Sequence, residues 1–419
     1  MGRLEMHGSG LKGPIPLSIS SLQGLIELRI SDINNTNQPF PMLDNMAGLT
    51  RLVLRNCNIS GVIPPYVWSF NKLRVLDLSF NKLTGQLPAT ISTNSLKFIF
   101  LSGNLFSGNV PNSMLKKETN VDLSYNNLTW QSPEDPACQG GQNLNLYRSF
   151  SMESNNSGIL PCIKKDQCPQ YGHSLYINCG GEDYDHIDAD GRNIKYLGDS
   201  TVLGGAATLF LRDKANWGLS STGDFMDDND FQNIRYTTTL PSLSISVLYT
   251  TARLSPLSLT YYHRCLENGN YSVTLHFAEI QFRDYQTYSS LGRRIFDIYI
   301  QDNLEEKDFN IENKANGVLK EFKKKYNASV TNNMLEIRFS WASKGTTRIP
   351  RRGVYGPLIS AISVDPNFKP RSEGGKKRTA PIVIGVLASC FIVLALLALF
   401  VLRWRGYLFW STKTGREKG

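Results

Sequence analysis

Leu73-Arg-Val-Leu76-Asp-Leu78 is the stretch that decides the fold of the first third of the chain. The same spacing of leucine-like residues recurs on both sides of it, with starts 24, 24, 23 and 22 residues apart: Leu25-Ile-Glu-Leu28-Arg-Ile30, Leu49-Thr-Arg-Leu52-Val-Leu54, Leu96-Lys-Phe-Ile99-Phe-Leu101 and the weaker Glu118-Thr-Asn-Val121-Asp-Leu123. A period of this length predicts a stack of coils, each adding one short strand to a sheet. Because one coil cannot bury its own apolar face, neighbouring coils must cover one another.

Two further features repeat in phase with the leucines. A polar residue follows the strand at Asn81, Asn104 and Asn126, with Cys57 in the same place one coil earlier. We expect these side chains to bond backbone groups that the turning chain leaves unpaired. A Gly-x-apolar-Pro sequence comes next, at Gly13–Pro16, Gly61–Pro64, Gly85–Pro88 and Gly108–Pro111. The pattern predicts a leucine-rich-repeat solenoid of about six coils over residues 1–129. It resembles the plant-specific subclass of these repeats, and its first coil has no N-terminal cap.

Side chains between the leucines face the concave surface of such a solenoid, where partners commonly bind. Four aromatic residues gather there on the last three coils, and they are our candidates for binding a protein or peptide: Phe80, Phe98, Phe100 and Tyr125. Two other readings remain open, because exposed aromatic residues can be scattered without a role and can also pack against the next domain.

After Thr129 the repeat period stops. Residues 130–171 contain Pro133, Pro136 and three cysteines, which is typical of a linker. Beyond it, short stretches of alternating apolar and polar residues predict strands, at 174–178, 271–277, 294–300, 334–341 and 359–365. Their spacing predicts an antiparallel β-sandwich over residues 172–366, without a long helix.

Several short sequences of this second domain resemble the malectin domain: Ile177-Asn-Cys-Gly-Gly-Glu182, Asn216-Trp-Gly218, Leu248-Tyr-Thr-Thr-Ala-Arg253, Leu275-His-Phe-Ala-Glu-Ile280, Arg294-Ile-Phe-Asp297 and Gly353-Val-Tyr-Gly-Pro357. With the repeats before it, the chain resembles the ectodomain of plant leucine-rich-repeat malectin receptor-like kinases. The resemblance implies extracellular ligand sensing, a plasma-membrane location and a serine/threonine kinase domain after the membrane. No glycine-rich loop, strand lysine or Asp-Phe-Gly metal motif occurs here, so we expect no enzyme activity from this chain.

The resemblance also implies a sugar site in the malectin domain. Two of its aromatic stacking positions fall on Trp217 and Phe282, which are our carbohydrate-binding candidates. Three others fall on Leu254, Gln281 and Gly356, in place of two tyrosines and an aspartate. Loss of that carboxylate removes a charge-assisted hydrogen bond to sugar hydroxyls, so we expect weak binding of simple sugars. The alternative is that Trp217 and Phe282 are ordinary core residues.

An uncharged stretch of 23 residues, Ala380 to Leu402, predicts one transmembrane α-helix, since it spans about 34 Å as a helix. The segments 369–378 and 403–419 on its two sides each hold five Lys or Arg against one Glu, and together they carry most of the net charge of +9. That placement argues against a nucleic-acid-binding face. We therefore predict a basic juxtamembrane linker over 367–379, the membrane helix over 380–402 and a short cytoplasmic tail over 403–419.

Six Asn-x-Ser/Thr sequons precede the predicted helix and none follows it: Asn34, Asn58, Asn127, Asn155, Asn270 and Asn327. They predict N-glycosylation and a single-pass, type I protein with its N-terminal side outside the cell. Residues 1–20 lack the apolar region of a signal peptide, so we expect either an upstream N-terminus or a truncated product.

For the cysteines we predict a Cys179–Cys265 disulfide, because both residues lie in strand-rich parts of one sandwich. It would close a loop of roughly 85 residues, for which chain entropy gives about 4–5 kcal/mol. Cys138, Cys162 and Cys168 can then form one further pair, while Cys57 and Cys390 stay free.

No metal site and no cofactor are expected, because acidic clusters such as Asp188-Ala-Asp190-Gly191 lack ligands of a calcium loop. The predicted function is that of a receptor ectodomain, with repeats that bind protein or peptide and a malectin domain that binds carbohydrate or a co-receptor kinase. The alternatives are a membrane-anchored cell-wall carbohydrate-binding module and a decoy receptor without a kinase.

Overall fold

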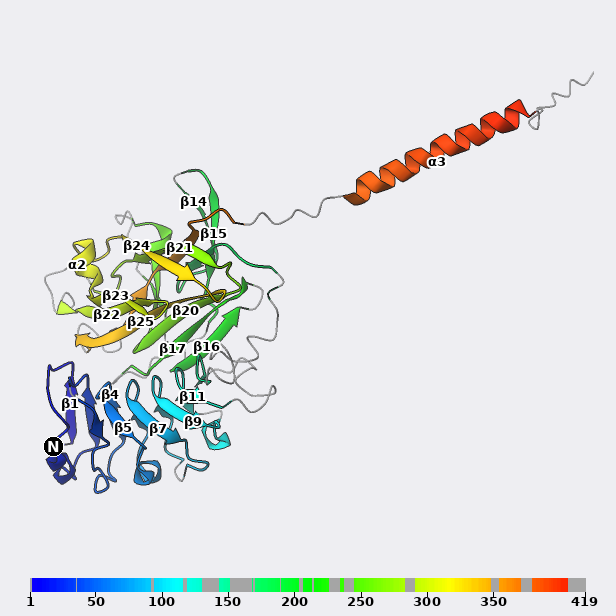
Figure 1. The fold of residues 1–419 in the computed structure, drawn as a ribbon. Coiled ribbons are helices and arrows are strands. Elements are labelled where there is room, and N and C mark those ends of the chain that lie inside the picture. Colours follow the sequence, from blue (N-terminus) through cyan, green and yellow to red (C-terminus); the bar gives the residue numbers. More distant parts are fainter. Residues whose placement is uncertain are drawn as a thin grey trace, which may run out of the picture. The chain divides into compact units, whose positions relative to one another are not determined.

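The first domain is a solenoid in which each coil adds one strand to a parallel sheet, as the leucine spacing predicts (Figure 1). The structure is a computed structural model of the chain. It describes residues 2–34, 36–91, 94–115, 119–129, 143–150, 168, 170–188, 190–202, 206–212, 215–225, 234–236, 245–282, 291–347, 354–370 and 379–405. The strands of this sheet, in spatial order, are β1 (Arg3–His7), β2 (Glu27–Ser31), β4 (Arg51–Arg55), β6 (Val75–Asp77), β8 (Phe98–Phe100), β10 (Asn120–Asp122) and β12 (Leu144–Asn145).

The other side of the coils carries a second, shorter parallel sheet, and three of the Gly-x-apolar-Pro segments begin at the ends of its strands. Its strands are β3 (Gln38–Pro39), β5 (Ile59–Gly61), β7 (Lys82–Gln86), β9 (Leu105–Gly108) and β11 (Asn127–Leu128). Short 3-10 turns connect the coils at Leu17–Ser21, Pro65–Ser69 and Asn112–Met114. Between the two sheets the leucines of successive coils form one core, in which Leu28, Leu52 and Leu76 are fully buried.

The asparagine ladder satisfies the backbone at the bend of each coil. The side-chain oxygen of Asn81 accepts hydrogen bonds from the backbone N–H groups of Cys57 and Ile59, at 3.0 and 3.1 Å. Its amide nitrogen donates to the carbonyl groups of Leu54 and Leu78, at 2.7 and 2.9 Å. Cys57 occupies the same place one coil earlier, and its thiol donates weakly to the Arg55 carbonyl at 3.2 Å. The ladder prediction is confirmed.

The solenoid extends further than residue 129. Strand β12 pairs with β10 and adds one more coil from within the predicted linker, through Leu144-Asn-Leu146. Leu146 and Phe150 belong to the repeat core. Without a regular period or a Gly-x-apolar-Pro segment in this part of the sequence, the coil could not be recognised from its leucines alone.

The second domain is a sandwich of two six-stranded sheets with a small third sheet. One large sheet contains, in spatial order, β14 (Tyr184–Ile187), β15 (Asn193–Gly198), β13 (Leu175–Asn178), β27 (Ala361–Pro366), β21 (Gly269–Phe277) and β24 (Phe322–Val330). The other contains β16 (Ala207–Arg212), β17 (Trp217–Thr222), β20 (Ser258–Arg264), β25 (Met334–Gly345), β22 (Arg294–Ile300) and β23 (Asn303–Phe309). The third contains β18 (Ile234–Tyr236), β19 (Thr251–Leu254) and β26 (Leu358–Ile359).

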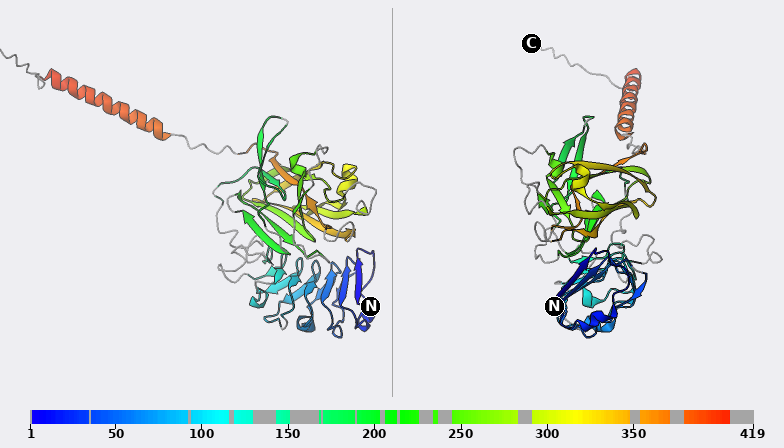
Figure 2. Two further views of the ribbon diagram at one scale, coloured as in Figure 1. Left: turned by 180° about the vertical axis from the view of Figure 1, so that it is seen from behind. Right: turned by 90° about the vertical axis from the view of Figure 1, so that its left-hand side faces the viewer.

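Almost all pairings of these strands are antiparallel, as predicted, and the two-residue pairing of β13 with β15 is parallel. Apolar residues from the two large sheets fill the space between them, among them Leu275, Ile298 and Phe339. A short helix, α2 (Ile311–Ala315), begins after Asn310, whose side chain accepts a hydrogen bond from the Asn313 backbone. Residues 1–368 form one compact unit, with the sandwich against one side of the repeats in both views of Figure 2.

The C-terminal part, residues 369–419, forms a separate unit. Its helix α3 (Thr379–Trp404) covers the segment predicted to be helical. Within the described part of the chain, no helix combines the length and the apolar character that a membrane crossing needs. The predicted crossing is therefore not confirmed.

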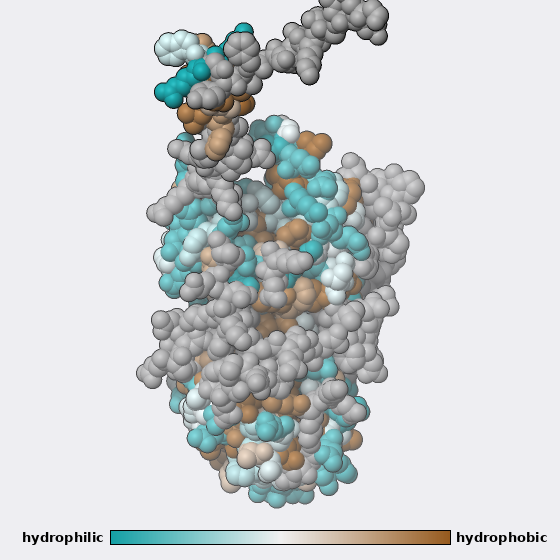
Figure 3. All heavy atoms as spheres, turned by 90° about the vertical axis from the view of Figure 1, so that its right-hand side faces the viewer, coloured by the Kyte–Doolittle hydropathy of each residue, from teal (hydrophilic) through white to brown (hydrophobic). Residues whose placement is uncertain are grey.

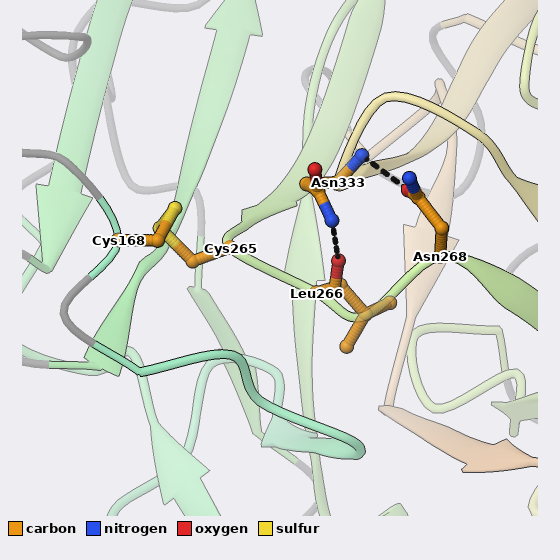
Figure 4. The surroundings of a disulfide bond; sticks show 5 residues. All are labelled: Cys168, Cys265, Leu266, Asn268 and Asn333. Carbon is orange, nitrogen blue, oxygen red and sulfur yellow. Dashed lines mark hydrogen bonds between the residues drawn. A yellow bond between two sulfur atoms is a disulfide. The ribbon is translucent and has the colours of Figure 1, made fainter. Parts of the chain in front are cut away.

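The predicted Cys179–Cys265 disulfide is wrong. Cys265 bonds Cys168 instead, with 5.5 Å between the two Cα atoms, and Cys179 is a free thiol in the sandwich core. Figure 4 shows this bond beside Asn333, whose side chain donates to the Leu266 carbonyl at 2.8 Å. The bond ties the end of the linker to the sandwich. Cys57 is free as predicted, and Cys138, Cys162 and the side chain of Cys390 lie outside the described residues.

Peptide mapping without reduction tests this pairing. We expect a disulfide-linked peptide that contains Cys168 and Cys265, because their separation suits a disulfide. Cys179 should be alkylated only after denaturation, since it is fully buried and burial raises the pKa of its thiol well above the ordinary value. Recovery of Cys179 in a disulfide with Cys265 would restore the pairing predicted from the sequence.

Candidate functional site

The concave face of the repeats is closed by the sandwich. One outward-facing residue is buried at the same register position of six neighbouring repeat strands: Arg29, Val53, Asp77, Phe100, Asp122 and Asn145. The hydroxyl group of Thr222 on β17 donates to Asp122 at 2.6 Å. The amide of Asn145 lies 2.8 Å from the hydroxyl oxygen of Ser220 on the same strand. This side of the solenoid is therefore occupied by the chain itself at its last coils.

The contact between the last repeat coils and the sandwich is called the seam here, and Glu336 on β25 lies at its centre. Its carboxylate accepts hydrogen bonds from the hydroxyl groups of Tyr125 and Tyr147, at 3.0 and 2.8 Å, and from Arg148 at 3.1 Å. The ring of Tyr147 stacks on that of Tyr262, with 4.8 Å between centroids. Burial, together with the Glu336 charge, raises the pKa of both seam tyrosines well above the ordinary value. They therefore stay neutral and act as donors.

The four aromatic candidates on the repeats have different surroundings. Phe100 is buried, and Phe98 is half-buried with its ring centroid 6.2 Å from that of Phe100. Tyr125 belongs to the seam, so it packs against the next domain, which was the alternative considered for these residues. Phe80 lines an open cleft. The structure therefore does not bring the four rings together as one binding surface.

That cleft, the seam cleft, has a volume of about 690 Å³ and lies between the two domains. On the repeat side it is lined by the segments that follow β2, β4 and β6, including Asp32, Arg55 and Phe80. On the sandwich side it is lined by β22, β23 and the last part of β25. In Figure 1 these three strands lie above the first repeat strands, whereas β16 and β17 lie above the last ones.

The walls of the seam cleft are rich in charge. Lys344 pairs with Asp308 at 2.6 Å, and Arg55 pairs with Asp77 at 3.2 Å. The guanidinium of Arg338 lies 4.1 Å from the centroid of the Tyr299 ring, a cation–π contact. Burial raises the pKa of Asp297 in the same wall.

Three buried polar atoms of the lining have no hydrogen-bond partner among the described residues: Asp32 Oδ2, Arg55 Nη2 and Arg338 Nε. A polar atom that stays buried and unpaired is costly, so it is a good indicator of a missing ligand or water. No group of three His, Cys, Asp or Glu side chains suited to a metal ion occurs in the part of the chain that the structure describes. The arrangement therefore suits the binding of a polar ligand.

The predicted sugar-stacking role of Trp217 and Phe282 is wrong, because both side chains are buried, with 0% and 1% exposed. Trp217 lies between Phe210 and Tyr261, with ring centroids 6.0 and 6.4 Å away. The ring of Phe282 is covered by the guanidinium of Arg294 at 5.2 Å. The alternative, that both are core residues, is the correct one.

Gly356 explains why no carboxylate stands at the position that the resemblance gives to an aspartate. Its φ of +88° is in the left-handed region, and a Cβ there would lie 2.0 Å from the Ser255 carbonyl oxygen. Any side chain at this position would collide with the backbone.

Two of the predicted glycosylation sites, Asn34 and Asn58, line the seam cleft. Asn127, Asn270 and Asn327 are exposed on strands β11, β21 and β24, and Asn155 lies outside the described residues. Glycosylation stays a prediction for all six. On one face of the molecule, hydrophilic residues spread over both domains, with hydrophobic residues in small groups between them (Figure 3).

A second polar cluster lies on the other large sheet, away from the seam. His276 on β21 contacts the hydroxyl oxygens of Ser363 and Tyr249 through its two ring nitrogens, each at 2.9 Å. The hydroxyl group of Tyr196 reaches the same Ser363 oxygen at 2.8 Å. Burial, and then the charges of Lys323 and His186, lower the pKa of His276 to about 4. Its hydrogen bonds are satisfied, so the cluster is a structural network.

The comparisons with known proteins agree with this architecture. Residues 173–362 match the malectin domain family, and residues 48–70 and 72–94 match the leucine-rich-repeat family. A probable leucine-rich-repeat receptor-like serine/threonine-protein kinase of Arabidopsis thaliana, RFK1, is 52% identical over 77% of this chain and 32% of its own length. A second kinase of this kind from the same plant, At1g29720, is 46% identical over 91% of this chain and 37% of its own length.

Among solved structures, the Arabidopsis receptor kinase HAESA, in complex with the peptide hormone IDA and the co-receptor SERK1, shares 33% identity over 35% of this chain and 24% of that chain. The TM-score is 0.30, so we draw nothing from that likeness.

The class of protein is thus a leucine-rich-repeat protein that carries a malectin domain. More particularly, the chain is a homologue of the plant leucine-rich-repeat receptor-like serine/threonine kinases, with ectodomain-type domains only, and it spans about a third of the length of the curated relatives it matches.

Replacement of the central seam carboxylate should destabilise the compact unit. Glu336→Ala leaves the buried Tyr147 hydroxyl group without its acceptor, whereas Tyr125 keeps a contact with Thr260 and Arg148 keeps Asp302, so we expect a loss of about 2–4 kcal/mol. Denaturant unfolding measures the loss, and small-angle scattering should show the domains apart. The exposed Glu305→Ala should change stability by less than about 0.5 kcal/mol. Equal effects of the two changes would contradict the role assigned to Glu336.

The His276 network should make stability depend on pH. Because the folded-state pKa is about 4 and that of an unfolded histidine about 6.5, the unfolded chain takes up the proton first as pH falls. The contribution of His276 to the free energy of unfolding is therefore fully present above about pH 6.5. As the pH falls towards 4, about 2–3 kcal/mol of this free energy is lost.

Denaturant unfolding at several pH values checks this expectation. His276→Gln should reduce the pH dependence by about half, because burial also lowers the pKa of His263 to about 4 and that histidine keeps its share. Tyr249→Phe removes one hydrogen bond but keeps the imidazole, so it should preserve the pH dependence. If the free energy of unfolding of His276→Gln changes with pH as steeply as that of the unchanged chain, another group is responsible for the pH dependence.

Proposed function

We propose that this chain is the extracellular, ligand-sensing part of a plant cell-surface receptor-like kinase, and that its ligand binds in the seam cleft. The observation that carries the proposal is the cleft itself, which both domains line and which contains three buried polar atoms without partners. A ligand in this place contacts the repeats and the malectin domain at once, so its binding energy depends on how the two domains are held.

The closed concave face supports this location. In a solenoid used for recognition, the outward-facing strand residues of the concave surface normally meet the partner. Here those residues are buried, and Asp122 and Asn145 already bond the sandwich. On the repeats, the segments that follow the strands are left for ligand binding, and three of them line the seam cleft.

A cell-wall carbohydrate-binding module is less well supported. Its main candidates, Trp217 and Phe282, have no ring face available to a sugar. A protein or peptide ligand, with a second receptor kinase as partner, is the proposal that remains. We also propose a plasma-membrane location, with the N-terminal side outside the cell, on the strength of the uncharged segment 380–402 and the basic residues on both sides of it.

A cleft-filling variant tests the proposal. Ser340 is half-buried in the cleft wall on β25, so Ser340→Trp should fill the cleft with little change to the core. Peptides below about 5 kDa, taken from plant cell-wall fluid, should raise the melting temperature of the full chain, as binding to the folded state does. We expect Ser340→Trp to lose this shift.

Ser18→Trp, at an exposed position of the first 3-10 turn, is the matched control and should keep the shift. The same shift in both tryptophan variants would exclude the seam cleft as the binding site. Surface biotinylation of plant cells that express the chain tests its location separately.

A further inference from the structure

Resting on the proposed function, we propose that the ligand of the seam cleft is an extended peptide segment with an acidic residue, whose carboxylate is held by Arg338 and Arg55.

Arg338 is a positioned cation without an anion. It lies on β25, half-buried, with its guanidinium 4.1 Å from the ring centroid of Tyr299 and 5.6 Å from that of Tyr125. These two cation–π contacts hold the guanidinium in place. No described carboxylate pairs with it, and its buried Nε has no acceptor within the described residues. A guanidinium held in place with a free N–H is suited to a carboxylate.

Arg55 offers a second donor from the repeat side. Its side chain is 5% exposed, and its guanidinium lies 4.9 Å from the centroid of the Trp341 ring. Its Nη1 pairs with Asp77, whereas Nη2 is buried without a partner in the described part of the chain. The two arginines therefore present unpaired N–H groups from opposite domains to one cleft, and a ligand carboxylate would satisfy both.

The charge balance favours a peptide over a polyanion. Lys344 and Arg55 are paired with Asp308 and Asp77. The lining also contains two further cations, Arg338 and Lys307, and two further acids, Asp32 and Asp297. A ligand with many negative charges would meet these two acids, whereas a peptide brings one carboxylate together with N–H donors. Asp32 Oδ2, buried and unpaired, is an acceptor for such a donor.

The backbone of the cleft also suits an extended chain. Strand β23 is the last strand of its sheet, and two of its residues, Lys307 and Asp308, line the cleft. An edge strand has free N–H and C=O groups that an added strand can use. The Asp308 N–H already donates to the Asp297 carboxylate at 2.7 Å, so the main-chain bonds that hold the peptide would come from other groups of β23. The arginines would select the acidic side chain of the peptide.

The rings of the cleft argue against a sugar. Trp341 is covered by Arg55 and by Tyr355, whose ring centroid is 4.7 Å away, and Tyr299 is covered on one side by Arg338. Phe80 lies against Gly103, where an added Cβ would be 2.7 Å from the ring. A sugar needs a free ring face to stack on, and most of these faces are taken.

The experiment uses the full chain, purified in detergent, and two synthetic fluorescent hexapeptide libraries that differ in one fixed position, Glu in one and Gln in the other. We expect binders in the Glu library. For the best of them, Arg338→Gln in the protein and Glu→Gln in the peptide should each weaken binding about tenfold or more. Arg338→Gln and the Glu→Gln peptide combined should weaken binding little more than either change alone, because both remove the same contact.

Controls separate this inference from the proposed function. Arg338→Lys should keep part of the affinity, and Arg74→Gln, at an exposed repeat position outside the cleft, should keep all of it. If Ser340→Trp abolishes binding but Arg338→Gln does not, the seam cleft is the site and acidic recognition is wrong. If neither changes binding, both ideas are wrong. Equal binding of the two libraries, or preference for an acidic oligosaccharide such as oligogalacturonate, would overturn the inference.

Discussion

Glu336 and the three side chains that donate to it determine how the two domains can be used. The glutamate projects from the outer face of a sandwich sheet, and it accepts from two tyrosines and an arginine of the last repeat coils. Arg148 also bonds Asp302 at 2.9 Å, so it joins the repeats to the turn after β22. A buried carboxylate with three donors is stable only when all of them stay in place. The seam therefore fixes the orientation of the sandwich, and that orientation leaves the cleft over the earlier coils.

The parts of the fold that depend on local patterns could be predicted from the sequence. The leucine period and the residues Asn81, Asn104 and Asn126 describe contacts between neighbouring coils, which lie a fixed number of residues apart. The strands at 294–300 and 334–341 follow from alternation along the chain itself, and the structure contains both of them. The coil at residues 143–150 was missed because it has neither a full leucine pattern nor a Gly-x-apolar-Pro segment.

Contacts between distant segments could not be predicted in the same way. Cys168 lies in a segment whose sequence is typical of a linker, and nothing in its surroundings indicates that the chain returns to Cys265, 97 residues away. The resemblance assigns Trp217 and Phe282 to sugar-stacking positions, but similarity in sequence does not report burial. The roles of Arg55 and Arg338 also depend on pairing across domains. One signal was available: Tyr125 and Phe100 are large apolar groups on a face that a free solenoid would expose to water, and such groups often mark an interface.

The closed concave face has a consequence for how the protein can change in evolution. Substitutions in the middle of the repeat strands alter the packing between two domains, so most of them would be removed by selection for stability. The segments that follow β2, β4 and β6 are connections between strands, and connections tolerate replacement more readily. Duplicated genes of this kind could therefore acquire new ligands through a few connecting residues, while the strands stay almost unchanged. Comparison of closely related copies should show variable positions as a stripe along one rim of the solenoid.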